Sequence, residues 1–138
     1  MYEDIIPPKS SKDRQSFFLE KAARIAQKSN MTHKHGCIIV QDDVIIAEGW
    51  NKITKHYNHS FSIHAEVDAI KKFKKIYNKS LLSQTEMYIV RIGSKYMDNC
   101  LKYSKPCENC QSVIMHYGIP KVFYSTNYEF DLIMQSQR

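Results

Sequence analysis

Two cysteines in the last third of the chain have the spacing of metal ligands. Cys107 and Cys110 lie three residues apart in the segment PCENC at 106–110. If a helix begins here, both side chains lie on one face of its first turn, so both sulfurs can reach one ion. The positive end of a helix dipole favours the thiolate, which is the form that binds metal. The spacing therefore predicts a metal site with two sulfur ligands.

A histidine and a glutamate in a second segment could complete this site. His64 and Glu66 stand at the start of another predicted helix, and the neutral imidazole of His64 is the obvious third ligand. Three protein ligands leave the fourth tetrahedral position of zinc for water, as in catalytic sites, whereas structural sites normally supply a fourth side chain. Glu66 points to another side of its helix, so we expect it to move a proton between that water and a substrate.

The elements that must position these residues follow from hydrophobic spacing. Helical spacing predicts helices over 11–28, from 64 to 78 and over 107–117, the last ended by Gly118. Short apolar runs predict strands at 37–40, 44–47, 87–92 and 122–124, the first two joined by a turn at 41–43. Residues 52–63 and 93–105 are predicted as loops, and the last dozen residues as a tail.

This order of elements predicts an α/β fold. Strand–helix–strand steps imply parallel crossovers, and the opening hairpin makes the sheet mixed. We therefore expect a single domain over residues 1–138, with three layers (α/β/α) and a mixed sheet of four to five strands. Both runs of the hairpin are apolar throughout, so we expect both faces of the sheet to be covered.

Composition limits the class of protein. The chain has 138 residues, 43% of them hydrophobic, and only 4 Gly and 4 Pro, so it can bury a core without a disulfide. We identify no membrane-spanning run and no secretory signal, and we therefore expect a cytoplasmic protein whose four cysteines are reduced or bind metal. The net charge of +6 favours an anionic partner such as a nucleotide phosphate or a nucleic acid, although solubility alone would also explain it.

Together these motifs resemble the cytidine/deoxycytidylate deaminase superfamily, the zinc-dependent nucleobase deaminases, in which H-x-E is followed by P-C-x-x-C. The resemblance extends from about His35 to Ser125 and includes HGCIIV, IIAEGWN, HAEVDAI, SKPCENC and YGIPKVFYST. It implies a cytidine-deaminase-like fold and a zinc ion held by His64, Cys107 and Cys110.

The resemblance also implies roles for three residues around the ion. Glu66 would be the catalytic proton shuttle, and the backbone N–H of Ala65 would face the base. Asn51 would hydrogen-bond the substrate, with a plain turn residue as the alternative. Relatives self-associate to complete each other's pockets, which implies a homo-oligomer. The chain departs from many relatives by an insert at roughly 93–103 and by a short C-terminal part, so a fifth strand and its helix could be reduced or absent.

The function we expect is hydrolytic deamination of cytosine in a nucleoside or (deoxy)nucleotide, giving uracil and ammonia. The alternatives are adenosine deamination in transfer RNA, a deaminase of single-stranded nucleic acid and, in another class, a zinc-stabilised binding subunit without turnover. Trp50, Tyr57 and Phe61 could stack on a base or simply pack the loop. The lysines within 71–75 are interpreted as a solvated helix face, and Cys37 as a small buried strand residue.

Overall fold

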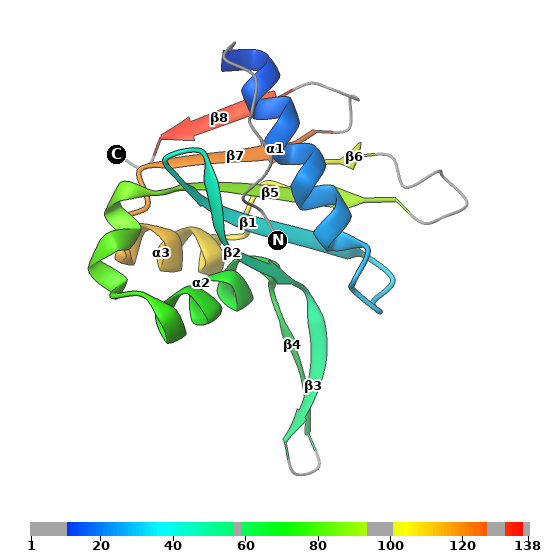
Figure 1. Cartoon of the computed structure of the whole chain (residues 1–138). Coiled ribbons are helices and arrows are strands. Elements are labelled where there is room, and N and C mark those ends of the chain that lie inside the picture. Colours follow the sequence, from blue (N-terminus) through cyan, green and yellow to red (C-terminus); the bar gives the residue numbers. More distant parts are fainter. Residues whose placement is uncertain (1–10, 57–58, 94–100, 127–131, 137–138) are drawn as a thin grey trace.

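The three α-helices and four of the strands lie close to the predicted ranges. The computed structural model describes residues 11–56, 59–93, 101–126 and 132–136 (Figure 1). Its helices are α1 (Ser11–Ala26), α2 (Ala65–Ile76), the 3-10 helix η1 (Lys79–Gln84) and α3 (Glu108–His116). Its strands are β1 (Lys34–Gln41), β2 (Val44–Trp50), β3 (Lys52–His56), β4 (His59–Ile63), β5 (Glu86–Ile92), β6 (Leu101–Lys102), β7 (Lys121–Ser125) and β8 (Leu132–Ser136).

A mixed sheet forms the centre of the fold. Its main strand order is β2-β1-β5-β7-β8, and the two-residue β6 pairs with the end of β5. β5 and β7 are parallel and are joined through α3, whereas the other neighbours are antiparallel. The predicted mixed sheet with a parallel crossover is confirmed, and β6 adds a sixth short strand to the five of the main path.

Helices cover both faces of this sheet, as predicted. Phe18 and Ala22 of α1 pack with Ile38 of β1 in one apolar cluster. Ile39, the next residue of β1, packs with Phe73 of α2 in a second cluster on the opposite face. Because successive strand residues point to opposite faces, β1 contributes to both cores and is apolar throughout. Figure 1 shows α1 on one side of the sheet and α2 with α3 on the other.

The predicted turn between the first two strands is a two-residue connection. Gln41 pairs with Val44, so Asp42 and Asp43 alone form the turn, and both have positive φ angles, 51° and 66°. Such left-handed pairs match the twist of antiparallel strands, and aspartate tolerates this conformation better than most residues.

Three segments predicted as irregular contain strands, which corrects the expectation. Residues 52–63 include the antiparallel hairpin β3–β4, which projects from the body of the molecule (Figure 1). Ile53 and Phe61 in this hairpin are 55% and 51% exposed, so those side chains of the hairpin whose burial is described show no buried face that would leave an alternating pattern in the sequence. β6 lies within the predicted loop at 93–105, and β8 supplies the fifth strand within the predicted tail. Residues 94–100 of the insert lie outside the described residues.

The first turns of α2 lie very close to β2. A Cβ atom added to Gly49 would lie 2.3 Å from the backbone nitrogen of Ala69 and 2.5 Å from the carbonyl oxygen of Ala65. No side chain fits in this space, so glycine at this position lets the helix rest directly on the strand. This contact fixes where α2 begins and therefore where His64 lies.

Asp68, near the start of α2, ties the helix to two strands. Its Oδ2 accepts a hydrogen bond from the backbone N–H of Trp50 at 3.2 Å and lies 2.9 Å from the Nζ atoms of both Lys52 and Lys72. Burial acts to raise the pKa of this carboxyl, but hydrogen bonds from Lys72, Lys52 and Trp50 outweigh it, and the pKa is lowered from its ordinary value. The charged carboxylate therefore favours the folded state.

We predict that Asp68→Asn lowers the free energy of unfolding by about 1.5–3 kcal/mol at pH 7, as expected for hydrogen bonds to a charged group. Because the pKa is lower in the folded state than in the unfolded state, this contribution is present above the ordinary value of 3.8 and is lost as the pH falls through the folded-state pKa. Urea denaturation between pH 7 and pH 3 measures the difference. The exposed Asp42→Asn is the control, and a difference for Asp68→Asn that does not shrink with acid would contradict the role of its charge.

Candidate metal centre and adjoining pocket

Two of the predicted ligands occupy the starts of two helices. His64 is the N-cap of α2 and Cys107 is the N-cap of α3, and both have extended backbone with ψ angles of 153° and 169°. Neither side chain makes a hydrogen bond that caps its own helix. Cys110 lies in the first turn of α3 and is buried. The imidazole and the two thiols are therefore directed toward each other instead of toward their own helices.

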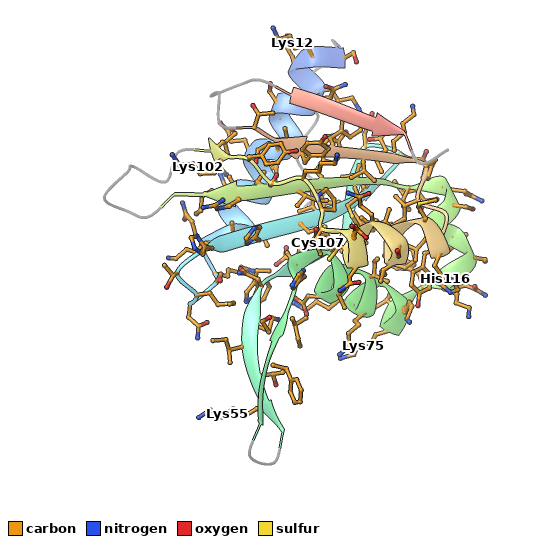
Figure 2. All side chains as sticks on the ribbon, turned by 180° about the vertical axis from the view of Figure 1, so that it is seen from behind. Lys12, Lys55, Lys75, Lys102, Cys107 and His116 are labelled. Carbon is orange, nitrogen blue, oxygen red and sulfur yellow. The ribbon has the colours of Figure 1, made fainter. Side chains whose placement is uncertain are left out.

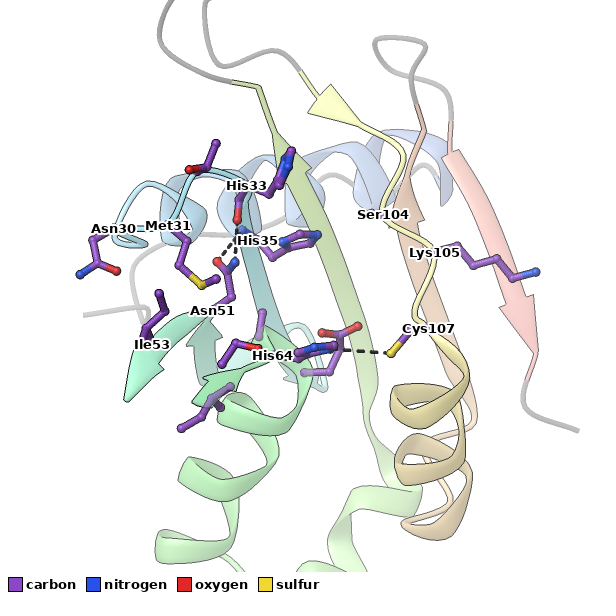
Figure 3. A pocket seen from close by; sticks show the side chains of 15 residues that line it. Asn30, Met31, His33, His35, Asn51, Ile53, His64, Ser104, Lys105 and Cys107 are labelled. Atoms are coloured by element: carbon purple, nitrogen blue, oxygen red, sulfur yellow. Dashed lines mark hydrogen bonds between the residues drawn. The ribbon is translucent and has the colours of Figure 1, made fainter. Parts of the chain in front are cut away.

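The three side chains converge on one point, and Figure 3 shows two of them, His64 and Cys107. Nδ1 of His64 lies 3.2 Å from Sγ of Cys110 and 3.7 Å from Sγ of Cys107, and each residue offers a ligand atom within 4.8 Å of the others. Tetrahedral zinc with bonds of about 2.3 Å to sulfur and about 2.0 Å to nitrogen holds such atoms about 3.6 Å apart. The three predicted ligands are thus positioned to bind one metal ion. No further His, Cys, Asp or Glu joins this group among the described residues.

The pKa of the Cys110 thiol shifts in the direction opposite to the one predicted from the sequence. Burial, followed by the neighbouring Glu66 and Cys107, raises the pKa of the Cys110 thiol above its ordinary value. The opposite shift was expected from the helix dipole alone, because the sequence did not reveal that this thiol is buried beside a carboxyl group. A thiol in such surroundings becomes a thiolate when a cation lies next to it, so the ligand set suits a divalent ion.

Glu66 lies beside this group and is only 5% exposed. Burial raises the pKa of its carboxyl above the ordinary value, against the opposing effects of its own backbone N–H, of His64 and of Cys110. Glu66 is therefore protonated more readily than a glutamate on the surface. A carboxyl group of this kind at the wall of a cavity can both accept and donate a proton.

A cavity of about 580 Å³ adjoins the metal ligands (Figure 3). Small-molecule sites have volumes of roughly 300–1,000 Å³, so this cavity can hold a ligand of that class. Its walls come from the segment after α1, the β3–β4 hairpin, the start of α2 and the segment before α3. Lining residues include the five predicted site residues other than Cys110, namely Asn51, His64, Ala65, Glu66 and Cys107.

Asn51 lies in the cavity wall, and its side chain is already bonded to the protein. Its Oδ1 accepts a hydrogen bond from the backbone N–H of His35 at 2.8 Å, and its Nδ2 donates to the carbonyl oxygen of His33 at 2.6 Å. These bonds fix the loop that precedes β1 against the end of β2. An amide has a second N–H and a second lone pair, so Asn51 retains capacity for a ligand.

Two buried serines, which sequence reasoning missed, hold the segment that leads to Cys107. Oγ of Ser104 donates to the carbonyl oxygen of Ile89 at 3.0 Å and accepts from the backbone N–H of Ser125 at 2.9 Å. The backbone N–H of Ser104 donates to the carbonyl oxygen of Ser125, also at 2.9 Å. The segment is therefore bonded to β5 and β7 shortly before Cys107. In the sequence, these serines resemble ordinary loop residues beside strands.

Trp50 was expected either to stack on a base or to pack the loop, and in the structure its ring packs against lysine side chains. The Nζ atoms of Lys28, Lys52 and Lys72 lie 4.9, 4.2 and 3.7 Å from the centre of its ring, and Trp50 does not line the cavity. One lysine of the predicted solvated face, Lys72, thus packs on this ring. Tyr57 lies outside the described residues. Cys37 is fully buried on β1, as predicted.

The fold and the site together define a class of protein. A three-layer α/β/α arrangement brings one histidine and two cysteines to the starts of two helices, with a buried glutamate beside them, and this set of residues is the signature of the zinc-dependent deaminases. Residues 12–126 match the family described as the cytidine and deoxycytidylate deaminase zinc-binding region, and the chain belongs to this family.

Two curated proteins and one solved structure illustrate what this chain is similar to. Deoxycytidylate deaminase of Saccharomyces cerevisiae is 27% identical over 136 residues, covering 84% of this chain and 38% of the yeast protein. Guanine deaminase of Bacillus subtilis is 31% identical over 117 residues, covering 80% of this chain and 64% of that protein. The chain therefore spans less than two thirds of the length of either relative. The crystal structure of dCMP deaminase from the cyanophage S-TIM5 in complex with dCMP and dUMP matches with a TM-score of 0.63 at 25% identity, covering 83% of this chain and 82% of that one.

None of the described helices has the length and hydrophobicity that crossing a membrane requires.

We predict that Ser104→Ala weakens zinc binding about 10- to 100-fold, the effect typical of groups that orient metal ligands. The variant leaves the N–H of Ser125 and the carbonyl of Ile89 without their side-chain partner, so the segment before Cys107 loses its side-chain bonds to β5 and β7 and keeps the backbone bond from Ser104 to Ser125. Competition with a chromophoric chelator measures the dissociation constant. Ser112→Ala, on the exposed side of α3, serves as the matched control. Equal zinc affinity in the two variants would show that the serine pair does not position the ligand.

Proposed function

We propose that the chain catalyses zinc-dependent hydrolytic deamination of a nucleobase, with cytosine in a nucleoside or nucleotide as the substrate and uracil and ammonia as the products. The observation that carries this proposal is the position of Glu66. Its buried carboxyl lines the same cavity as His64 and Cys107, so proton transfer and metal-assisted chemistry would take place at one end of one pocket.

The residues present fit a catalytic zinc ion. One imidazole and two thiols converge, and no fourth side chain of a ligating type joins them among the described residues. Zinc held by His64, Cys107 and Cys110 would lower the pKa of a water molecule to about 7 and make it a nucleophile at neutral pH.

Glu66 would accept and donate protons during the reaction. The attacking water adds its oxygen to C4 of cytosine, and Glu66 takes one proton from it and delivers this proton to N3 of the ring. The second proton of the water follows to the exocyclic amino group, so that the C4–N bond breaks and ammonia leaves. No proton is gained or lost overall, and a carboxyl group whose pKa is raised by burial suits both transfers.

Two further groups would orient the base. Ala65 is the first residue of α2, and the N–H groups of the first helical turn have no acceptor within the helix. The backbone N–H of Ala65, at the cavity wall, would therefore donate to the base. Asn51 would contribute its remaining hydrogen-bonding capacity to the sugar or the base and would hold the loop before β1 in place.

The choice of cytosine rests on similarity. The yeast relative and the cyanophage structure both carry the name of a deoxycytidylate deaminase. Guanine is the second candidate base, because the relative with 31% identity is a guanine deaminase. A homo-oligomer, implied by the resemblance to the family, stays a prediction.

We predict that Glu66→Gln lowers kcat at least about 100-fold while the protein still binds one zinc ion per chain, because the amide cannot transfer the proton. Ammonia release is measured for cytosine, cytidine, deoxycytidine, their monophosphates, guanine and adenosine, together with zinc content by atomic emission. Glu20→Gln, on the exposed side of α1, is the control.

A zinc-loaded wild-type chain that releases no ammonia from any of these substrates would overturn the enzymatic proposal in favour of a binding subunit. Ammonia release from guanine alone would support the proposed reaction but would show that guanine, not cytosine, is the substrate base. A Glu66→Gln variant with wild-type kcat would remove Glu66 from the mechanism.

A further inference from the structure

A second hollow lies on the outer side of α2 and α3 and shares no lining residue with the metal cavity. It has a volume of about 390 Å³ and lies between the two helices, which are side by side in Figure 1 and Figure 2. This α2–α3 groove is lined from α2 by Val67, Ile70, Lys71 and Lys74, and from α3 by a stretch that includes Val113 and Tyr117. The proposed deamination uses none of these residues, so the groove has no assigned role.

The groove is elongated along α2. Its four α2 residues stand at positions i, i+3, i+4 and i+7, which share one face of a helix. From Val67 to Lys74 the helix rises about 10 Å, so the groove extends over two turns. A third helix can lay a row of its own side chains into such a groove between two helices. The shape therefore suits a helical segment better than a compact ligand.

The floor of the groove is apolar and its rim is basic. Ile70 is buried in the core cluster under α2, and Val113 packs against that cluster, so the floor is continuous with the core. Lys71 and Lys74 are exposed, and neither forms an ion pair with a described residue. Among the described residues that line the groove there is no aspartate or glutamate. These features are complementary to a stripe of apolar side chains flanked by carboxylates.

The aromatic ring of the groove is already in contact with other side chains. Nζ of Lys74 donates a hydrogen bond to the hydroxyl of Tyr117 at 2.7 Å and lies 5.0 Å from the centre of the Tyr117 ring. The His116 ring packs edge-on against the same ring, with 4.9 Å between the ring centres. Proteins that bind single-stranded nucleic acid present aromatic rings that are free to stack on bases. The arrangement therefore favours a protein partner over a nucleic acid.

The charge of the groove disfavours a second copy of this chain as its occupant. In a two-fold symmetric dimer the same surface patch faces itself, so Lys71 and Lys74 would lie close to the same lysines of the other copy. The whole chain carries a net charge of +6, so contact between two copies would bring like charges together. An acidic partner would be attracted by the same charges.

We propose that the α2–α3 groove binds an acidic amphipathic helix of another protein. The apolar side chains of that helix would lie over Ile70 and Val113, and its carboxylates would pair with Lys71 and Lys74. Recognition of a helix in a groove uses apolar anchors spaced by three or four residues, which matches the spacing of the groove residues along α2. The proposal concerns a surface outside the metal cavity and does not depend on the proposed deamination.

The test uses three designed helical peptides and the zinc-loaded full chain in low-salt buffer. One peptide has leucines at every third or fourth position flanked by glutamates, the second has lysines in place of the glutamates, and the third has serines in place of the leucines. By fluorescence anisotropy, we expect the first peptide to bind at least about 10-fold more tightly than either of the others, because only it satisfies both the apolar floor and the basic rim.

Charge reversal on the protein locates the binding surface. The double variant Lys71→Glu/Lys74→Glu should bind the lysine peptide more tightly than the glutamate peptide. Lys12→Glu/Arg24→Glu makes the same change in charge at exposed positions of α1, on the opposite face of the sheet, and should keep the preference for the glutamate peptide. The comparison of peptides on the wild-type chain needs no variant, so it tests the proposal even if a variant fails to fold.

Four results would overturn the proposal. They are equal binding of the glutamate and lysine peptides to the wild-type chain, the same peptide preference in the two double variants, displacement of the glutamate peptide by a single-stranded oligonucleotide, and a wild-type dimer in light scattering that Lys71→Glu/Lys74→Glu converts to monomers. The third result would assign the groove to nucleic acid, and the fourth would assign it to a second copy. None of these measurements depends on ammonia release, so the groove and the proposed function can fail separately.

Discussion

The site depends on one geometric constraint, which is that two helices begin next to each other at the same edge of the sheet. The N-cap residues of α2 and α3, His64 and Cys107, have extended backbone and no capping bond of their own. Their side chains can therefore meet, and Cys110 joins them from the first turn of α3. Helix N-termini also carry partial positive charge, which suits thiolates and substrate anions. If either helix began one turn later, the ligands would separate by several ångströms.

Several local features maintain this arrangement, and each acts on the backbone. Gly49 permits direct contact between α2 and β2, and Asp68 bonds the start of α2 to Trp50. On the other side, Ser104 and Ser125 fix the approach to α3. The face of the sheet under α1 combines apolar packing with ion pairs from Arg14 to Asp43 and Glu86, whereas the opposite face combines its core with the buried carboxyl of Glu66. The residues that could carry the chemistry thus lie on the α2 side of the sheet.

The sequence predicted those features that depend on residues close together in the chain. The ligands His64, Cys107 and Cys110 were predicted because their spacing within two short segments already carries the chemistry, and the structure brings them together. The long helices and β1 were predicted because their buried residues leave a clear hydrophobic period. The hairpin β3–β4 was missed because its exposed residues leave no such period. The role of Ser104 depends on partners distant in sequence, Ile89 and Ser125, which no local pattern reveals.

The zinc K-edge X-ray absorption spectrum of the purified protein tests the metal site most directly. We expect one zinc ion per chain, with two sulfur neighbours at about 2.3 Å and two nitrogen or oxygen neighbours at about 2.0 Å, of which only one is an imidazole. Cys110→Ser should reduce the sulfur neighbours from two to one. A protein that retains no zinc, or a spectrum with three or four sulfur neighbours or with two imidazoles, would contradict the central claim that His64, Cys107 and Cys110 form an open catalytic site.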